Sequence, residues 1–163
     1  MFCIIQFGII PNNRAKEADY ARKQTDALTH DISVIDNYVS PYIGDANNIC
    51  GLFEVLPLNN VSMKLEINSE KCALTVNYLD TVWNIGEEKA YRDLVYNSVA
   101  AMAAIDNLST ITYNFSGASY YFERTGIENV FGSPLSELLQ QDIWNKEVQE
   151  KLNDSHFVEQ FFQ

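Results

Sequence analysis

The stretch MKLEINSEKCALTVNY, residues 63–78, decides the class of fold. Apolar and polar residues alternate over 63–68 and again over 72–78, and Ser69-Glu70 separates the two runs. Such alternation places the apolar side chains on one face of a strand, and a short polar break between two runs is typical of a hairpin. The stretch therefore predicts two antiparallel strands with one buried face.

A second hairpin and an intervening helix complete this pattern. Residues 110–122, TITYNFSGASYYF, alternate in the same way around the turn Ser116-Gly117. Residues 87–105 have helical spacing, and Glu87-Glu88 opens this helix, where acidic side chains complement the helix dipole. The run 99–105 is small and apolar all round, which favours close packing on a sheet. We expect an α+β domain with a four-stranded, mainly antiparallel sheet and helices on one face.

Residues 14–40 are predicted to form one long amphipathic helix. Its apolar or small residues recur every three or four positions, as one stripe of an α-helix does; they are Ala18, Ala21, Thr25, Leu28, Ile32, Ile35 and Val39. Ser40-Pro41 ends the helix, because proline disfavours the α conformation of the residue before it. The stripe either docks on its own domain as part of a monomer or joins two chains as a heptad helix over 18–39. Its alanines favour the docked monomer.

The remaining segments flank this arrangement. Residues 41–140 are assigned to the α+β core domain, and residues 141–163 to a helical, acidic C-terminal tail. Residues 1–13 are an apolar arm of the domain or the stub of a membrane segment or leader. Their apolar run is shorter than the roughly 20 residues that cross a bilayer, and it lacks the basic start and cleavage site of a signal peptide.

Two capping signals mark helix starts inside the core domain. Asp45 is expected to be the N-cap of a short helix that ends before Pro57. Thr125 with Glu128 forms the sequence pattern of a capping box, and Gly132 is expected to close the helix that follows.

The charge balance excludes some classes of partner. The chain has 163 residues, with 22 acidic against 11 basic side chains, and a formal net charge of −11. Nucleic-acid binding relies on clustered Lys and Arg, so no nucleic acid is expected as a partner. Anionic lipid headgroups are disfavoured for the same reason.

Residues that usually carry catalysis or bind metals are few. Cys3, Cys50 and Cys72 have no C-x-x-C spacing, so zinc and redox motifs are absent and the thiols are expected to be dispensable. His30 is expected on the solvated side of the first helix. His156 and Glu159 have the spacing of half a carboxylate-bridged metal site, without its other ligands. We expect no enzyme activity, no catalytic residue, no cofactor and no metal.

The second hairpin carries the candidate binding surface. Tyr113, Tyr120, Tyr121 and Phe122 put aromatic groups on both faces of the sheet, so at least one is expected to be exposed. Exposed aromatic side chains favour a binding surface. The alternative is that the apolar C-terminal tail covers them.

Four short motifs resemble the bacterial domain of unknown function family 4825. They are YIGDANNI (42–49), LPL (56–58), LTVNY (74–78) and AIDNL (104–108), and the resemblance spans roughly residues 39–139. It implies an extracytoplasmic domain of Gram-positive bacteria that follows a lipoprotein or membrane anchor, or that is fused to an antirepressor-type membrane metallopeptidase. No activity or ligand site is known for this family, and the chain has no H-E-x-x-H motif, so no peptidase activity is implied.

We expect a non-enzymatic, extracytoplasmic binding or sensory domain of a bacterial membrane-associated protein. Its partner would be a protein or a cell-wall ligand, it would be a monomer, and it would reach the membrane only through an N-terminal anchor. Two alternatives stay open: a structural module that self-associates through the heptad helix 18–39, and a cytoplasmic interaction domain.

Overall fold

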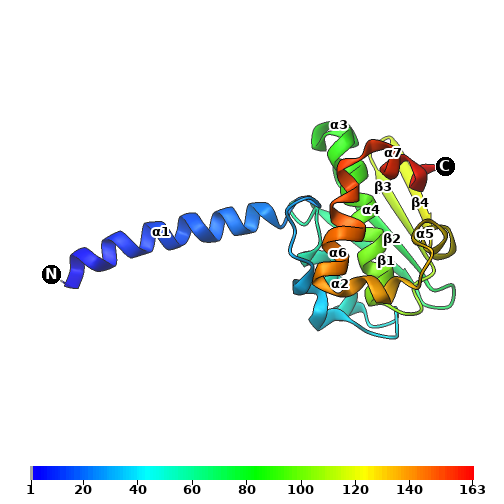
Figure 1. Cartoon of the computed structure of the whole chain (residues 1–163), viewed down its shortest axis with the longest axis horizontal. Helices are drawn as coiled ribbons and strands as arrows, with labels where there is room; N and C mark the ends of the chain where they lie inside the picture. The colour runs from blue at the N-terminus through cyan, green and yellow to red at the C-terminus, as the bar shows by residue number, and fades with distance from the viewer. Residues whose placement is uncertain (1) are drawn as a thin grey trace.

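A four-stranded sheet forms one layer of the domain (Figure 1). The computed structural model describes the backbone of residues 2–163 and the side chains of residues 13–163. The strands are β1 (Met63–Asn68), β2 (Ala73–Tyr78), β3 (Thr110–Phe115) and β4 (Ala118–Glu123), in the order β1-β2-β3-β4. The two hairpins are antiparallel and β2 pairs with β3 in parallel, because a helix crosses over between them. The predicted α+β fold with a mainly antiparallel sheet is confirmed.

Helical segments make up most of the rest. In chain order they are α1 (Phe2–Lys23), η1 (Ile32–Tyr38), α2 (Ala46–Val55), α3 (Val82–Ile85), α4 (Glu87–Ala104), α5 (Arg124–Phe131), η2 (Leu135–Leu139), α6 (Gln141–Trp144), η3 (Asn145–Gln149), η4 (Lys151–Asn153), α7 (Ser155–Glu159) and η5 (Gln160–Phe162). The tail over 141–163 is therefore helical, as expected.

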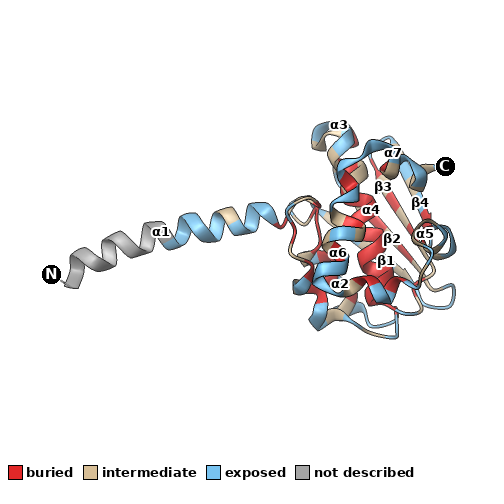
Figure 2. Ribbon diagram, in the orientation of Figure 1, coloured by how far each residue is buried: buried red, intermediate tan, exposed pale blue. Residues whose placement is uncertain are grey.

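The central helix α4 lies between the sheet and the outer helices. Every residue of α4 from Asp93 to Ala104 is buried, and Figure 2 shows this helix red through its middle. On the sheet side, the hydroxyl of Ser98 on α4 is hydrogen-bonded to that of the buried Tyr113 on β3 at 3.1 Å. On the other side it contacts η1 and η2, and Tyr96 packs edge-on against the buried Trp144 at 4.9 Å.

The opposite face of the sheet is polar. A row of hydrogen bonds crosses it from strand to strand: Asn77 Nδ2 donates to Glu66 Oε1 at 3.3 Å, and Asn114 Nδ2 donates to Asn77 Oδ1 at 2.9 Å. Ser119 Oγ donates to Asn114 Oδ1 at 2.7 Å and completes the row. One buried face and one polar face are what the alternation in both hairpins predicts.

The predicted single helix over 14–40 is wrong. The N-terminal helix is long but ends at Lys23, turns follow, and the chain resumes in the 3-10 segment η1. Side chains in the turn compete with helical bonding: Thr29 Oγ1 donates to the Lys23 carbonyl, and Asp26 Oδ1 accepts from the Leu28 amide. The buried Asp93 of α4 accepts from the Ala27 amide at 2.7 Å and fixes the turn.

The predicted apolar stripe over 18–39 is divided between a buried part and an exposed part. Ile32 and Ile35 are buried in the core of their own chain, where η1 contacts α2, α4 and α6. Ala18 and Ala21 are exposed on α1, whose described residues extend away from the domain (Figure 1). The continuous heptad surface over 18–39 that the self-association alternative requires is therefore not formed.

The apolar segment 1–13 remains a prediction, because side chains before Asn13 lie outside the described residues. Among the residues that are described, no helix combines the length and hydrophobicity needed to cross a membrane.

One of the two capping predictions holds. Asp45 caps α2, its Oδ1 accepting from the Asn48 amide at 3.1 Å. Thr125 is not an N-cap: α5 begins one residue earlier, at Arg124, and Glu128 lies 3.6 Å from the Arg124 guanidinium instead of reaching back to the helix start. Gly132 closes α5 in the left-handed conformation, with φ 68°.

Candidate functional site

The four aromatic residues of the second hairpin do not form one surface. Tyr113 and Phe122 are buried, because they face inward in the alternation of β3 and β4. Tyr121 points to the other face and is 59% exposed. Tyr120 is half-buried on the inner face. The predicted surface is therefore wrong for Tyr113 and Phe122.

The C-terminal tail covers the inner aromatic residues, as the alternative expected. The ring of Phe162 lies 5.7 Å from that of Tyr120 and 5.3 Å from that of Phe122, in edge-to-face contact with both. It also lies 5.0 Å from the ring of Tyr91 on α4. The tail thus meets the sheet and the start of α4 at the same place.

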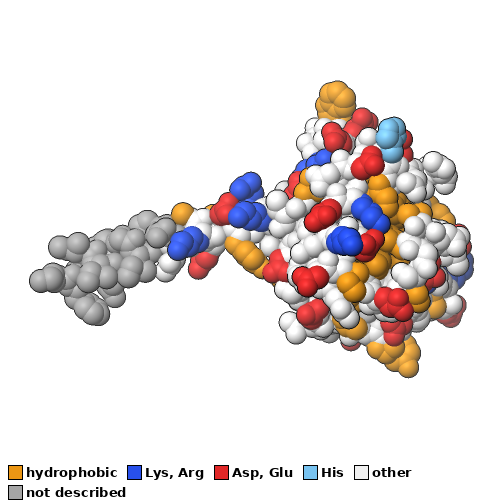
Figure 3. Space-filling model, viewed as in Figure 1, with side chains coloured by type: hydrophobic (Ala, Val, Ile, Leu, Met, Phe, Trp, Pro, Cys, Tyr) orange, Lys and Arg blue, Asp and Glu red, His pale blue; other side chains and the backbone are white. Residues whose placement is uncertain are grey.

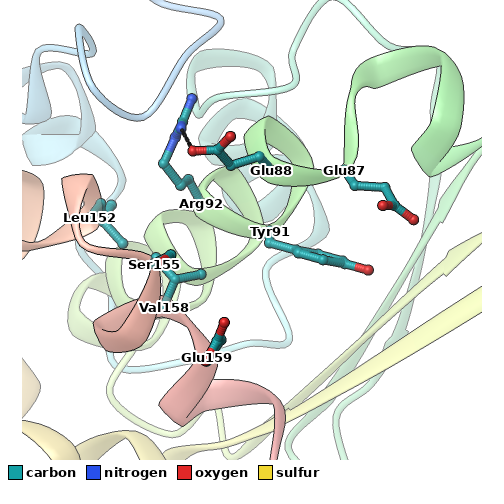
Figure 4. Close-up of a pocket in the computed structure, with 8 residues that line it drawn as sticks. All are labelled: Glu87, Glu88, Tyr91, Arg92, Leu152, Ser155, Val158 and Glu159. Atoms are coloured by element: carbon teal, nitrogen blue, oxygen red, sulfur yellow. Dashed lines mark hydrogen bonds and ion pairs between the residues drawn. The ribbon is translucent and has the colours of Figure 1, made fainter.

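A groove runs along this junction and consists of two adjoining hollows. The first, about 270 Å³, is lined by the first turns of α4 and by the tail (Figure 4); its residues are Glu87, Glu88, Tyr91, Arg92, Leu152, Ser155, Val158 and Glu159. The second, about 440 Å³, is lined by Tyr91, Tyr120, Val158, Glu159, Phe162 and Gln163. We call the two together the groove.

Helical spacing explains why these side chains converge. Glu87 and Tyr91 are four residues apart on α4, so they lie on the same face of the helix. Val158 and Glu159 follow Ser155 by three and four residues, so they share one face of α7, which contacts α4. The Asp154 carboxylate fixes the start of α7 by accepting from the His156 amide at 2.9 Å.

The second hollow has an aromatic wall. The rings of Tyr91 and Tyr120 meet edge to face at 5.6 Å, and Phe162 contacts both. Burial, with smaller contributions from Tyr91 and from the negative charge of Glu87, raises the pKa of Tyr120 to about 12. Tyr120 therefore stays neutral at ordinary pH.

The first hollow has a mainly acidic rim. Glu88 pairs with Arg92 at 3.1 Å, and the Arg92 side chain is only 18% exposed. Glu159 lies 3.6 Å from the imidazole of His156, an ion pair that exists only when this histidine is protonated. Glu87 makes no ion pair with any described residue. At neutral pH the rim therefore carries more negative than positive charge. On the face of the domain seen in Figure 3, hydrophobic side chains reach the surface among charged ones.

His30 is buried, contrary to the expectation that it faces solvent. Its Nε2–H donates to the Val55 carbonyl and its Nδ1 accepts from the Tyr96 hydroxyl, both at 2.7 Å. Burial lowers the pKa of His30, so the ring is neutral. Nearby, burial raises the pKa of Asp93 to about 6 in spite of its ion pair with Lys89. These groups join α4 to the turn after α1 and do not line the groove.

The remaining candidate groups stay apart. The free thiols of Cys50 and Cys72 are exposed and half-buried, respectively. The His156 side chain is 87% exposed. The described residues contain no group of three or more His, Cys, Asp or Glu side chains placed to share a metal ion. The groove combines a hollow shape with carboxylates and aromatic side chains.

The fold and the groove define an α+β domain in which a helical tail packs over the inner edge of a small sheet. The profile of the family described as "Domain of unknown function (DUF4825)" matches residues 35–125, just over half of the chain, and the chain belongs to this family. The match contains the sheet, α4 and the groove residues Tyr91 and Tyr120, and it ends before the tail. No curated protein and no solved structure gives a significant match.

Proposed function

We propose that this chain is a non-enzymatic binding domain on the extracytoplasmic side of a bacterial membrane, and that it binds its ligand in the groove. The observation that carries the binding role is the groove itself, where aromatic and aliphatic side chains lie beside carboxylates within one surface hollow. Concave sites lined by apolar groups with a few polar groups are the usual form of ligand sites.

Two features support a location next to a membrane. The described part of α1 extends away from the domain as a stalk (Figure 1), and the sequence MFCIIQFGII at its far end is almost wholly apolar. The chain shares four motifs with a family from which we expect an extracytoplasmic location, and this resemblance supports the same location here. A binding domain held away from a bilayer by such a stalk leaves the groove accessible to solutes and to other proteins.

Labelling of Cys50 in cells tests the location. Cys50 is exposed, so it reacts with a membrane-impermeant maleimide wherever the reagent reaches it. In the natural full-length protein, with Cys3 and Cys72 replaced by Ser, we expect labelling of intact cells. A matched Cys50→Ser variant gives the background. Labelling that appears only after the cells are lysed would contradict the proposal and favour the cytoplasmic interaction domain.

A further inference from the structure

We infer that the groove binds a basic amphipathic peptide segment, with a Lys or Arg side chain at the acidic rim of the first hollow and a large apolar side chain in the second. This inference names the ligand class of the proposed function and rests on it only for the choice of the groove as the binding site.

Charge complementarity selects a cation. Of the three carboxylates at the rim, only that of Glu88 has a permanently charged partner, the guanidinium of Arg92. Glu87 and Glu159 therefore leave a negative excess over the first hollow. The net charge of −11 on the whole chain adds a longer-range attraction for cationic ligands and a repulsion of anionic ones.

The lining of the groove selects a ligand that is also apolar. The rings of Tyr91, Tyr120 and Phe162 are half-buried and form an aromatic wall. The almost fully buried Leu152 and Val158 lie at the base of the hollows. An inorganic cation gains nothing from these surfaces. An alkylammonium or guanidinium group gains from the carboxylates and from the faces of aromatic rings, and its neighbours gain from burial of apolar area.

The spacing of the two hollows favours a peptide over a free amine. The hollows share Tyr91, Val158 and Glu159, so a ligand that occupies both presents its charge and its apolar group side by side. Neighbouring side chains along a peptide have this arrangement. A fatty acid or an anionic lipid has an apolar part that fits the second hollow, but its negative charge is repelled by the acidic rim.

A defined probe tests the inference on the purified 163-residue chain. Fluorescence anisotropy is measured with a fluorescein-labelled peptide, Gly-Lys-Leu-Lys-Phe-Gly, and with two relatives in which either both lysines are Glu or the Leu and Phe are Ser. We expect binding of the first peptide, weaker at high salt because the rim is exposed to solvent. Both relatives should bind at least about tenfold more weakly, since each lacks one of the two contacts.

Matched variants locate the binding. Glu87 and Glu159 are both exposed. Removing one exposed carboxylate should weaken binding about two- to fivefold, so Glu87→Gln with Glu159→Gln should weaken it roughly tenfold. Glu137→Gln is the control, because Glu137 is equally acidic and exposed but lines neither hollow. Phe162→Leu should weaken binding of the first peptide through its apolar side chains. A melting curve for each variant shows that it is folded.

Three outcomes would overturn the inference. The first is that the first peptide does not bind, and the second is that the double Glu variant has no effect. The third is that the peptide without Leu and Phe binds equally well, because this indicates simple attraction to an acidic protein. None of these depends on where the protein lies in the cell, and the Cys50 labelling does not depend on the peptide. A failure of the ligand class and a failure of the proposed location are thus distinguishable.

Discussion

Arg124 is predicted to be a main support of the domain core. Its Nε donates to the Leu108 carbonyl at 2.9 Å, and one terminal nitrogen donates to the carbonyls of Met102 and Ile105 at 2.7 and 2.8 Å. These carbonyls lie at and just beyond the end of α4, where a helix lacks internal partners for its last carbonyl groups. The residues that carry them are fully buried, so water is a poor replacement for the guanidinium.

The cost of removing this side chain follows from these bonds. Arg124→Met keeps most of the length and apolar stem but leaves three buried carbonyls without their donor. A bond to a charged group contributes about 1.5–3 kcal/mol, and two of the three bonds share one nitrogen. We therefore expect a loss of about 3–4 kcal/mol in the free energy of unfolding, a large part of the roughly 5–15 kcal/mol typical of a domain. For a chain of this length, Tm should fall by about 6–16 °C.

Urea denaturation at pH 7.5, with thermal melts, measures this loss. Glu128→Gln is the matched control, because it removes the ion pair with Arg124 but none of the three bonds to carbonyls. It should cost less than about 1 kcal/mol, as exposed pairs do. If Arg124→Met costs no more than Glu128→Gln, the reasoning about the end of α4 is wrong.

Three further predictions follow from buried or exposed side chains. Ile32→Ala should cost about 2–4 kcal/mol through lost burial and a cavity, with a Tm that does not change over a hundredfold range of protein concentration; sedimentation that shows a dimer split by this variant would contradict it. Adding reductant should shift Tm by less than about 2 °C, because Cys50 and Cys72 are free and no bond is lost. Burial lowers the pKa of His30 in the folded state, so the unfolded chain takes up a proton first as the pH falls through about 6.5. The stability from a neutral His30 is complete above that pH and lost below it, so urea titrations should show a steeper decline from pH 7.5 to 5 for the wild type than for His30→Gln. Asp93, whose raised pKa of about 6 acts with the opposite sign, is present in both proteins and leaves this comparison intact.

The sheet and its central helix could be predicted because their signals are local. Period-two alternation and the Ser116-Gly117 turn depend on neighbouring residues. Gly117 has a positive φ of 86°, which glycine adopts without steric cost at the second central position of a turn. The small apolar run over 99–105 predicted a helix packed closely on the sheet, and α4 is buried between the sheet and the outer helices.

The break after Lys23 could not be predicted from periodicity, because the apolar stripe continues through it. Asp93 accepts from the Ala27 amide, and Gln149 donates to the Ala27 and His30 carbonyls at 2.7 and 2.9 Å. These partners are far away in the sequence, and they stabilise a turn where the local pattern favours a helix. The one local signal against a continuous helix is the cluster of Thr and Asp residues at 25–31, because their side chains compete for backbone hydrogen bonds.

The groove was missed for a related reason. The helix dipole accounts for Glu87-Glu88 without a binding site, and the aromatic residues of the hairpin give no sign of their contact with α4. The spacing of Glu87 and Tyr91 places both on one face of α4, and that of Ser155 and Glu159 places both on one face of α7. Only the packing of the tail on α4 brings these faces together.

The tail determines what the groove is. The family match supplies Tyr91 and Tyr120, but the opposite wall, with Val158, Glu159 and Phe162, lies beyond it. That wall is held by contacts of α7 with α4 and by the packing of Phe162 on Tyr120 and Phe122. A fragment limited to the matched residues would expose Tyr120 and Phe122 and lose half of the groove. Ligand binding in this chain, as proposed, is therefore a property of the family domain and its tail together, and a relative with a different tail would have a different groove on the same sheet.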